Sequence, residues 1–168
     1  MSLSYPGSSP NKPCFSRLYL AYSGMGYPSL MMTATEAVIK AATNRKKGKL
    51  SGARKHYQDA AKLYREQHDS LAYAHAIRHI ADTYQEEKDL VSAKPLYEEA
   101  LEIYRSNLDT KLLDLANAVR PYALLLEEQG DSGSARELWA EARHLYDSLR
   151  IREGVSECNT HLSQLQRS

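Results

Sequence analysis

The segment Ala93–Tyr104, AKPLYEEALEIY, decides the fold because its pattern occurs three times in the chain. The other two copies are ARKHYQDAAKLY at 53–64 and ARELWAEARHLY at 135–146. Each copy has alanine, an aromatic residue, a second alanine, an aliphatic residue and tyrosine in the same order and spacing. The copies begin at residues 53, 93 and 135, so the period is 40 to 42 residues. A fixed period of this size indicates stacked supersecondary units rather than one globular core.

Apolar residues within each unit fall at helical spacing, which predicts two helices per unit. In the middle unit one apolar stripe runs through Ile77–Tyr84, and the polar turn at 87–89 separates it from the stripe of the quoted segment. In the last unit Gly130 and Asp131 occupy the corresponding turn. Glycine there can end one helix in the left-handed conformation, and aspartate can cap the next helix.

Small residues recur where the two helices of a unit have to approach closely. Ala81 and Ala123 lie in the first helices of their units, and Ala93 and Ala135 are expected to face them from the second helices. A larger side chain would push each pair apart, so these alanines are predicted core positions. Trp139 holds an aromatic position of the repeat, and we expect it to be buried against the closing helix.

The spacing of aliphatic residues, alanine and an aromatic residue, followed by a short turn and Ala-x3-aromatic-x2-Ala, resembles the tetratricopeptide repeat. The resemblance covers about Thr33 to Tyr146, with a period longer than the usual ~34 residues. The longer form is similar to the repeats of kinesin light chains and of bacterial regulatory proteins. It implies an all-α fold, a right-handed superhelix (α-solenoid) of antiparallel helix pairs, with about three units and a C-terminal closing helix.

The chain divides into a tail and a repeat domain. Four of its six prolines lie in residues 1–31, which are interpreted as a flexible or loosely packed tail. An open alternative is that the apolar residues of 15–22 cover the first helix or lie in a groove. The repeat domain is expected at 32–168, and Thr33 with Glu36 has the spacing of a helix capping box. Its expected units are 33–67, 70–107 and 111–149, with a closing helix at 153–166.

Charge and cysteine content exclude several classes of protein. The chain has 22 basic and 21 acidic side chains, a net charge of +1, which gives no long-range attraction for nucleic acid or an anionic membrane. Its longest apolar runs are far shorter than a bilayer span. Cys14 and Cys158 lie at opposite ends of the chain and favour free thiols over a disulfide framework. The predicted location is cytoplasmic.

The resemblance implies a concave face lined by the first helix of each unit, and in this family that face usually binds peptides. Its positions in the first unit are Thr35, Val38, Ala42 and Arg45. Its positions in the next two units are His75, Arg78, Asp82, Gln85, Asn117, Arg120, Leu124 and Glu127. Arg78 and Arg120 occupy the same place in successive units, and we hypothesise that they clamp a carboxylate of an extended peptide. The alternative is that Arg78 pairs with Asp82 one turn later.

The sequence contains no recognisable catalytic motif. His75, His79 and Asp82 follow one another at about one-turn intervals that superficially suit zinc, but Arg78 between them would oppose a metal ion. No nucleophile, base and orienting group form a known motif, and there is no phosphate-binding glycine loop. We therefore interpret the chain as a non-catalytic adaptor or scaffold for a protein or peptide partner, without metal or cofactor. A self-associating structural module (a homo-oligomer) and a fragment of a larger regulatory protein stay open as alternatives.

Overall fold

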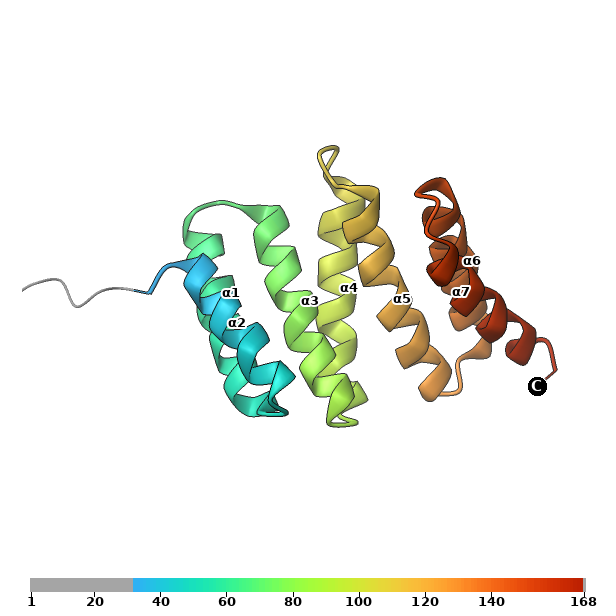
Figure 1. Ribbon diagram of the computed structural model, residues 1–168, viewed down its shortest axis with the longest axis horizontal. Helices are drawn as coiled ribbons and strands as arrows, with labels where there is room; N and C mark the ends of the chain where they lie inside the picture. The colour runs from blue at the N-terminus through green and yellow to red at the C-terminus, as the bar shows by residue number, and fades with distance from the viewer. Residues whose placement is uncertain (1–31, 168) are drawn as a thin grey trace, which may run out of the picture. The chain divides into compact units, whose positions relative to one another are not determined.

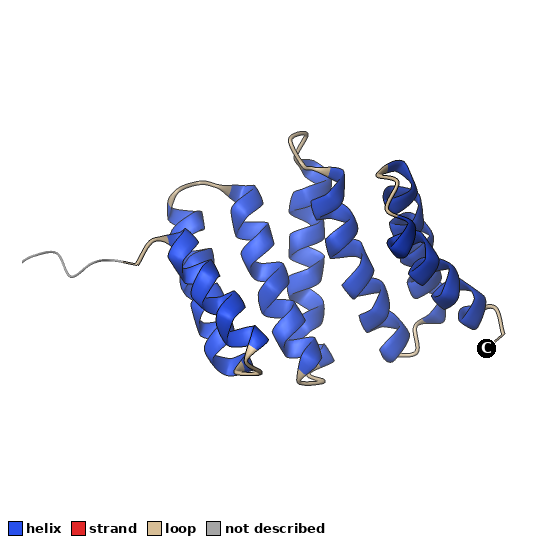
Figure 2. Ribbon diagram, viewed as in Figure 1, coloured by secondary structure: helices blue, strands red, loops and turns tan. Residues whose placement is uncertain are grey.

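The computed structural model describes residues 32–167, which form seven α-helices and contain no strand (Figures 1 and 2). The helices are α1 (Ala34–Lys46), α2 (Leu50–Glu66), α3 (Ser70–Glu86), α4 (Leu90–Ser106), α5 (Leu112–Glu128), α6 (Ser132–Ser148) and α7 (Arg152–Leu165). The prediction of an all-α fold is confirmed. The expected tail at 1–31 lies outside the described residues.

Neighbouring helices pack against one another in sequence order, from α1 on α2 to α6 on α7 (Figure 1). Most contacts therefore lie between elements that are neighbours in sequence, as in an α-solenoid. The pairs α1–α2, α3–α4 and α5–α6 are the three stacked units, and α7 follows as the closing helix. Helix α3 also contacts α5, which brings the first helices of the second and third units together. Within residues 32–167 no helix is both long and apolar enough to cross a bilayer.

The predicted helix caps are present. Thr33 Oγ1 accepts a hydrogen bond from the backbone N–H of Glu36 (3.2 Å), and Glu36 Oε2 accepts one from the N–H of Thr33 (2.8 Å), which completes the capping box. Asp131 caps α6 by accepting from the N–H of Ser134 (3.1 Å). Gly130 has a φ of +83°, the left-handed conformation expected at this turn.

The connection between α4 and α5 differs from the other turns. Asn107 has extended backbone angles, and its Oδ1 accepts from the N–H of Asp109 (2.9 Å) within an irregular loop. Leu108 in this loop is fully exposed, and Leu112 and Leu113 at the start of α5 are also exposed. This end of the third unit therefore presents apolar side chains to solvent.

The core is built from the repeated small and aromatic residues. Ala81, Ala93, Ala123 and Ala135 are completely buried, as predicted from the repeat. Trp139 is also completely buried, and its ring stacks on that of His161 in α7 with the ring centroids 4.0 Å apart. The closing helix therefore covers the third unit through an aromatic contact. It buries the apolar face that a terminal repeat would otherwise expose.

Candidate functional site

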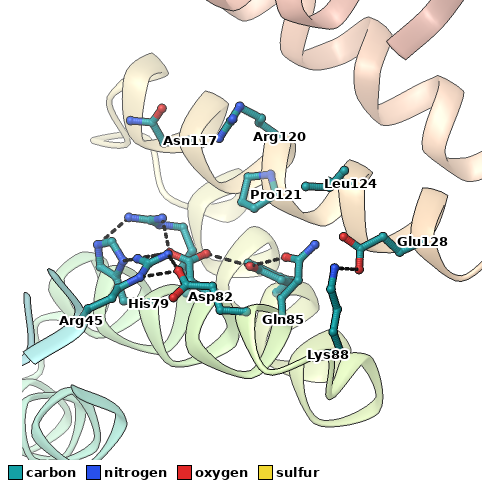
Figure 3. A pocket seen from close by; sticks show the side chains of 13 residues that line it. Arg45, His79, Asp82, Gln85, Lys88, Asn117, Arg120, Pro121, Leu124 and Glu128 are labelled. Carbon is teal, nitrogen blue, oxygen red and sulfur yellow. Dashed lines mark hydrogen bonds and ion pairs between the residues drawn. The ribbon is translucent and has the colours of Figure 1, made fainter. Parts of the chain in front are cut away.

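A cavity of about 500 Å³ lies between the first helices of the three units. Six of the eight predicted groove residues of the second and third units line it: Arg78, Asp82, Gln85, Asn117, Arg120 and Leu124. Figure 3 shows α5 with Asn117, Arg120, Pro121 and Leu124 opposite the polar side chains of α3. We call this cavity the inner groove.

Two of the predicted residues, His75 and Glu127, do not line the inner groove. The ring of His75 meets that of His79 edge-on, with centroids 4.6 Å apart. Burial, together with the charges of His79 and Arg78, lowers the pKa of His75 to about 4. The carboxylate of Glu127 instead accepts hydrogen bonds from Trp139 Nε1 (2.9 Å) and pairs with His161 Nδ1 (2.9 Å). It therefore joins α5 to α6 and α7.

The first unit contributes less to the inner groove than expected. Thr35, Val38 and Ala42 are not among its lining residues, whereas Arg45 is. Arg45 lies in the last turn of α1 and reaches across to α3. Its Nε donates to Glu86 Oε1 (2.7 Å), and its Nη1 donates to Asp82 Oδ2 (2.9 Å). The first unit thus supplies one cation to the inner groove and no apolar surface.

Asp82 is the centre of the polar network beneath the inner groove. Its Oδ2 accepts from Arg45 Nη1, from Arg78 Nη1 (3.1 Å) and from His79 Nδ1 (2.9 Å), and its Oδ1 accepts from Tyr97 Oη (2.7 Å). Burial raises the pKa of Asp82, but the hydrogen bond from His79 and the charges of both arginines outweigh it and hold the pKa well below its usual range. Asp82 is therefore an ionised acceptor that ties α1, α3 and α4 together.

The tautomer of His79 follows from its neighbours. Arg78 Nη2 lies 2.7 Å from His79 Nε2, and a guanidinium can only donate. His79 Nε2 therefore accepts, and we assign the ring proton to Nδ1, which lies closer to the acceptor Asp82 Oδ2 (2.9 Å) than to the donor Arg45 Nη1 (3.2 Å). Burial also lowers the pKa of His79, which favours this neutral form. The histidine pair considered for zinc is thus part of a hydrogen-bonded network, and the described residues contain no cluster suited to a metal ion.

Gln85 connects this network to α5. Its Nε2 donates to Tyr97 Oη (2.8 Å) and to the carbonyl of Pro121 (3.3 Å), while its Oε1 accepts from the N–H of Leu125 (3.2 Å). The side-chain amide of Gln85 therefore spans one turn of α5. This contact fixes the spacing between α3 and α5, the two helices that form the walls of the inner groove.

The two in-register arginines are not equivalent. Arg78 has a side chain only 11% exposed and pairs with Asp82, which is 7% exposed, so the local alternative considered for Arg78 is what the structure shows. Arg120 is 43% exposed and makes a two-pronged contact with Glu157 of α7, from Nε to Oε2 (2.7 Å) and from Nη2 to Oε1 (2.6 Å). Arg78 is structural, and Arg120 is the accessible guanidinium of the inner groove.

Asn117 offers polar groups to the inner groove. Its Oδ1 accepts from Tyr146 Oη (3.1 Å), and its Nδ2 makes no hydrogen bond within residues 32–167. Pro121 has no N–H, so the carbonyl of Asn117 lacks the partner that an α-helix normally provides one turn later. Leu124, half-buried on the next turn, adds an apolar surface beside these groups.

Some groove residues were not anticipated. Lys88 and Glu128 form an ion pair (3.2 Å) at the edge of the inner groove, between the ends of α3 and α5 (Figure 3). Their positions are one repeat period apart, as are those of Arg45 and Glu86. Opposite charges separated by one repeat period were the sequence signal that could have predicted these two ion pairs. Tyr97 is an aromatic position of the repeat, and sequence spacing gives no reason to expect its hydroxyl at Asp82.

Residues 34–106 match the model of the tetratricopeptide repeat family. These residues carry tetratricopeptide repeats. The match spans α1 to α4, and the third pair, α5–α6, repeats their sequence pattern and packing beyond it. Tetratricopeptide repeats generally mediate protein–protein interaction, which supports a non-catalytic interaction module. The closer resemblance to kinesin light chains stays a prediction, and no curated protein matches the chain.

Proposed function

We propose that this tetratricopeptide repeat chain is an adaptor that binds an extended segment of a partner protein in the inner groove. The observation that carries the proposal is the cavity between α3 and α5, where polar groups of Asn117 that have no partner within residues 32–167 lie beside an apolar wall. Its volume of about 500 Å³ falls in the ~300–1,000 Å³ range of protein ligand sites. The proposal concerns the face that the resemblance to tetratricopeptide repeats implies as the peptide-binding face.

The groups of α5 suit a peptide main chain. The Nδ2 of Asn117 can donate to a peptide carbonyl, and the backbone carbonyl of Asn117 can accept from a peptide N–H. Leu124 and Pro121 lie one to two turns further along α5 and can pack against an apolar side chain of the same segment. Because an extended chain presents donor, acceptor and side chain at short intervals, one segment can meet all of these groups.

The remaining predicted residues are assigned supporting roles. Arg78, Asp82 and Gln85 hold the wall of α3 in place through the buried network, so their contribution is the shape of the groove. His75 packs on His79 behind that wall, and Glu127 holds the closing helix. Binding itself therefore rests on Asn117, Leu124 and, at the edge, Arg120.

We place this interaction in the cytoplasm. Cys158 is a buried free thiol, in keeping with a compartment that maintains reduced cysteines. The balanced charge of +1 favours a protein partner over nucleic acid.

A second candidate, self-association, is favoured by one observation. Leu108, Leu112 and Leu113 present an exposed apolar surface where α4 connects to α5. Light scattering over a dilution series tests it directly. A mass that rises with concentration in the parent protein, and that stays monomeric in Leu108→Asp, would favour this function over the adaptor.

The adaptor proposal is tested with two matched substitutions. A second cavity of about 650 Å³ lies between α2, α3 and α4, with Leu96 on its wall. Leu96 and Leu124 are both half-buried, so Leu96→Lys and Leu124→Lys introduce the same change in the two cavities. Peptides selected from a displayed random library on the parent protein should lose binding to Leu124→Lys and keep binding to Leu96→Lys. The reverse result would move the site to the second cavity.

A further inference from the structure

We infer that the segment bound in the inner groove carries one carboxylate, and that this carboxylate displaces Glu157 of the closing helix from its ion pair with Arg120. The inference rests on the proposed function and adds the chemistry of the partner and a built-in competitor. Arg120 lines the inner groove, and Glu157 does not. Glu157 of α7 thus pairs with the guanidinium of Arg120, next to the place where a ligand would meet Asn117 and Leu124.

The contact between Arg120 and Glu157 has the geometry of a carboxylate site. Two N–H groups of Arg120 meet the two oxygens of Glu157 at 2.7 and 2.6 Å. This forked arrangement is the one by which arginine recognises a carboxylate. The hydrogen bond from Arg120 lowers the pKa of Glu157, so the carboxylate is held in its ionised form. A ligand carboxylate in the same place would find a guanidinium already oriented for it.

Exposure makes this ion pair exchangeable. The side chains of Arg120 and Glu157 are 43% and 36% exposed, whereas those of Arg78 and Asp82 are almost buried. Exposed ion pairs contribute little free energy, since water solvates the separated charges, but breaking a buried pair is costly. Glu157 can therefore turn into solvent, whereas Asp82 cannot release its arginines without loss of stability.

The exchange requires rotation of one side chain and leaves α7 in place. Cys158 and Leu165 of α7 are buried, and His161 stacks on Trp139 and pairs with Glu127. Arg136 Nη2 of α6 also donates to the carbonyl of Leu165 (2.7 Å). These contacts hold the closing helix independently of Glu157.

The charges around the inner groove favour one ligand carboxylate, placed near Arg120. The other cations that line it already face acidic groups: Arg45 meets Asp82 and Glu86, Arg78 meets Asp82, and Lys88 meets Glu128. A second carboxylate further along the groove would approach Glu86 or Glu128 and be repelled. An acidic side chain or a free C-terminus beside an apolar residue fits these charges better than a polyacidic run.

The test uses peptides selected on the parent protein and their affinity for three variants. Arg120→Ala should weaken binding by about tenfold, since a charge-assisted hydrogen bond is lost. Glu157→Gln should tighten binding by about two- to fivefold, because the competitor loses its charge. Glu153→Gln removes the same charge from an exposed position of α7 and should leave the affinity unchanged. Melting temperatures check folding, and Arg120→Gln replaces Arg120→Ala if the latter is destabilised.

The outcomes separate this inference from the proposed function. Peptides that depend on Leu124 but bind Arg120→Ala and Glu157→Gln like the parent would overturn the carboxylate exchange and leave the groove assignment intact. Weaker binding to Glu157→Gln would also overturn it, since Glu157 would then assist the ligand. If no selected peptide depends on Leu124, the proposed function itself fails.

Discussion

Tyr97 of α4 donates its hydroxyl proton to Oδ1 of Asp82 in α3 over 2.7 Å, in the buried interior of the second unit. Burial, and the charge and hydrogen bond of Asp82, raise the pKa of Tyr97 far above its usual range, so the hydroxyl remains a donor at all physiological pH values. The relationship places the ionised carboxylate of Asp82 directly beneath the inner groove. This carboxylate fixes the helices that form the groove.

Asp82→Ala should destabilise the fold strongly. The substitution leaves Arg78 and the Tyr97 hydroxyl buried without their acceptor, a loss expected to cost about 3–5 kcal/mol. Urea unfolding followed by circular dichroism measures it. Asp59→Ala, at a half-exposed aspartate that pairs with His56, is the control and should change stability by less than ~0.5 kcal/mol. Similar values for the two variants would contradict the role assigned to Asp82.

Stability should fall as the pH falls from about 6.5 to about 4. The pKa of His75 is lowered in the folded state to about 4 from an ordinary value of 6.5, so within this window the unfolded chain binds a proton that the folded chain excludes. The stabilisation is complete above pH 6.5 and is lost toward pH 4, with a slope of at most about 1.4 kcal/mol per pH unit for one proton.

Urea unfolding at several pH values checks this dependence. His75→Gln should flatten the curve in part, because His79 also has a lowered pKa and still contributes. Unchanged stability of the parent protein across the window would show that His75 is protonated in the folded state.

Trp139→Ala should cost about 3–5 kcal/mol, as expected for deletion of a fully buried aromatic side chain. The variant loses the stack on His161 and the hydrogen bond to Glu127, so the closing helix should exchange its amide hydrogens faster than α1 does. Chemical unfolding measures the first effect and hydrogen exchange the second. A loss below ~1 kcal/mol would mean that Trp139 is not a core residue.

Gly154→Ala should destabilise the protein although alanine is the better helix former. A Cβ at this position of α7 would lie 2.5–2.8 Å from three ring atoms of Tyr146, and such overpacking typically costs about 1–3 kcal/mol. Gly133→Ala is the matched change in α6, where the nearest atom is Asp131 Oδ1 at 3.8 Å, and it should be neutral or stabilising by up to ~1 kcal/mol. Thermal unfolding compares them, and equal shifts would contradict the close approach.

The repeat pattern was sufficient to predict the helices because their spacing is local. Thr33, Gly130 and the buried alanines were placed correctly, since caps and core positions depend on neighbours within a few residues. The pairing of Arg78 with Asp82 was foreseen as an alternative for the same reason, because the two residues lie one helical turn apart.

Contacts between distant parts of the chain could not be predicted in this way. The partner of Arg120 is Glu157, which belongs to the closing helix and not to the repeat pattern. Glu127 was assigned to the groove by its position, but donors from Trp139 and His161 hold it between α5 and the following helices. Which side chains meet across helices depends on their axial rotation, which a spacing pattern does not specify.

The central claim is that a partner segment lies between α3 and α5. Amide hydrogen exchange of the protein, free and saturated with a peptide selected on it, tests this claim most directly. We predict slower exchange in residues 70–86 and 112–128 on binding, and unchanged exchange in residues 50–66 and 90–106. Slower exchange confined to 50–66 and 90–106 would place the ligand on the opposite helices and contradict the account.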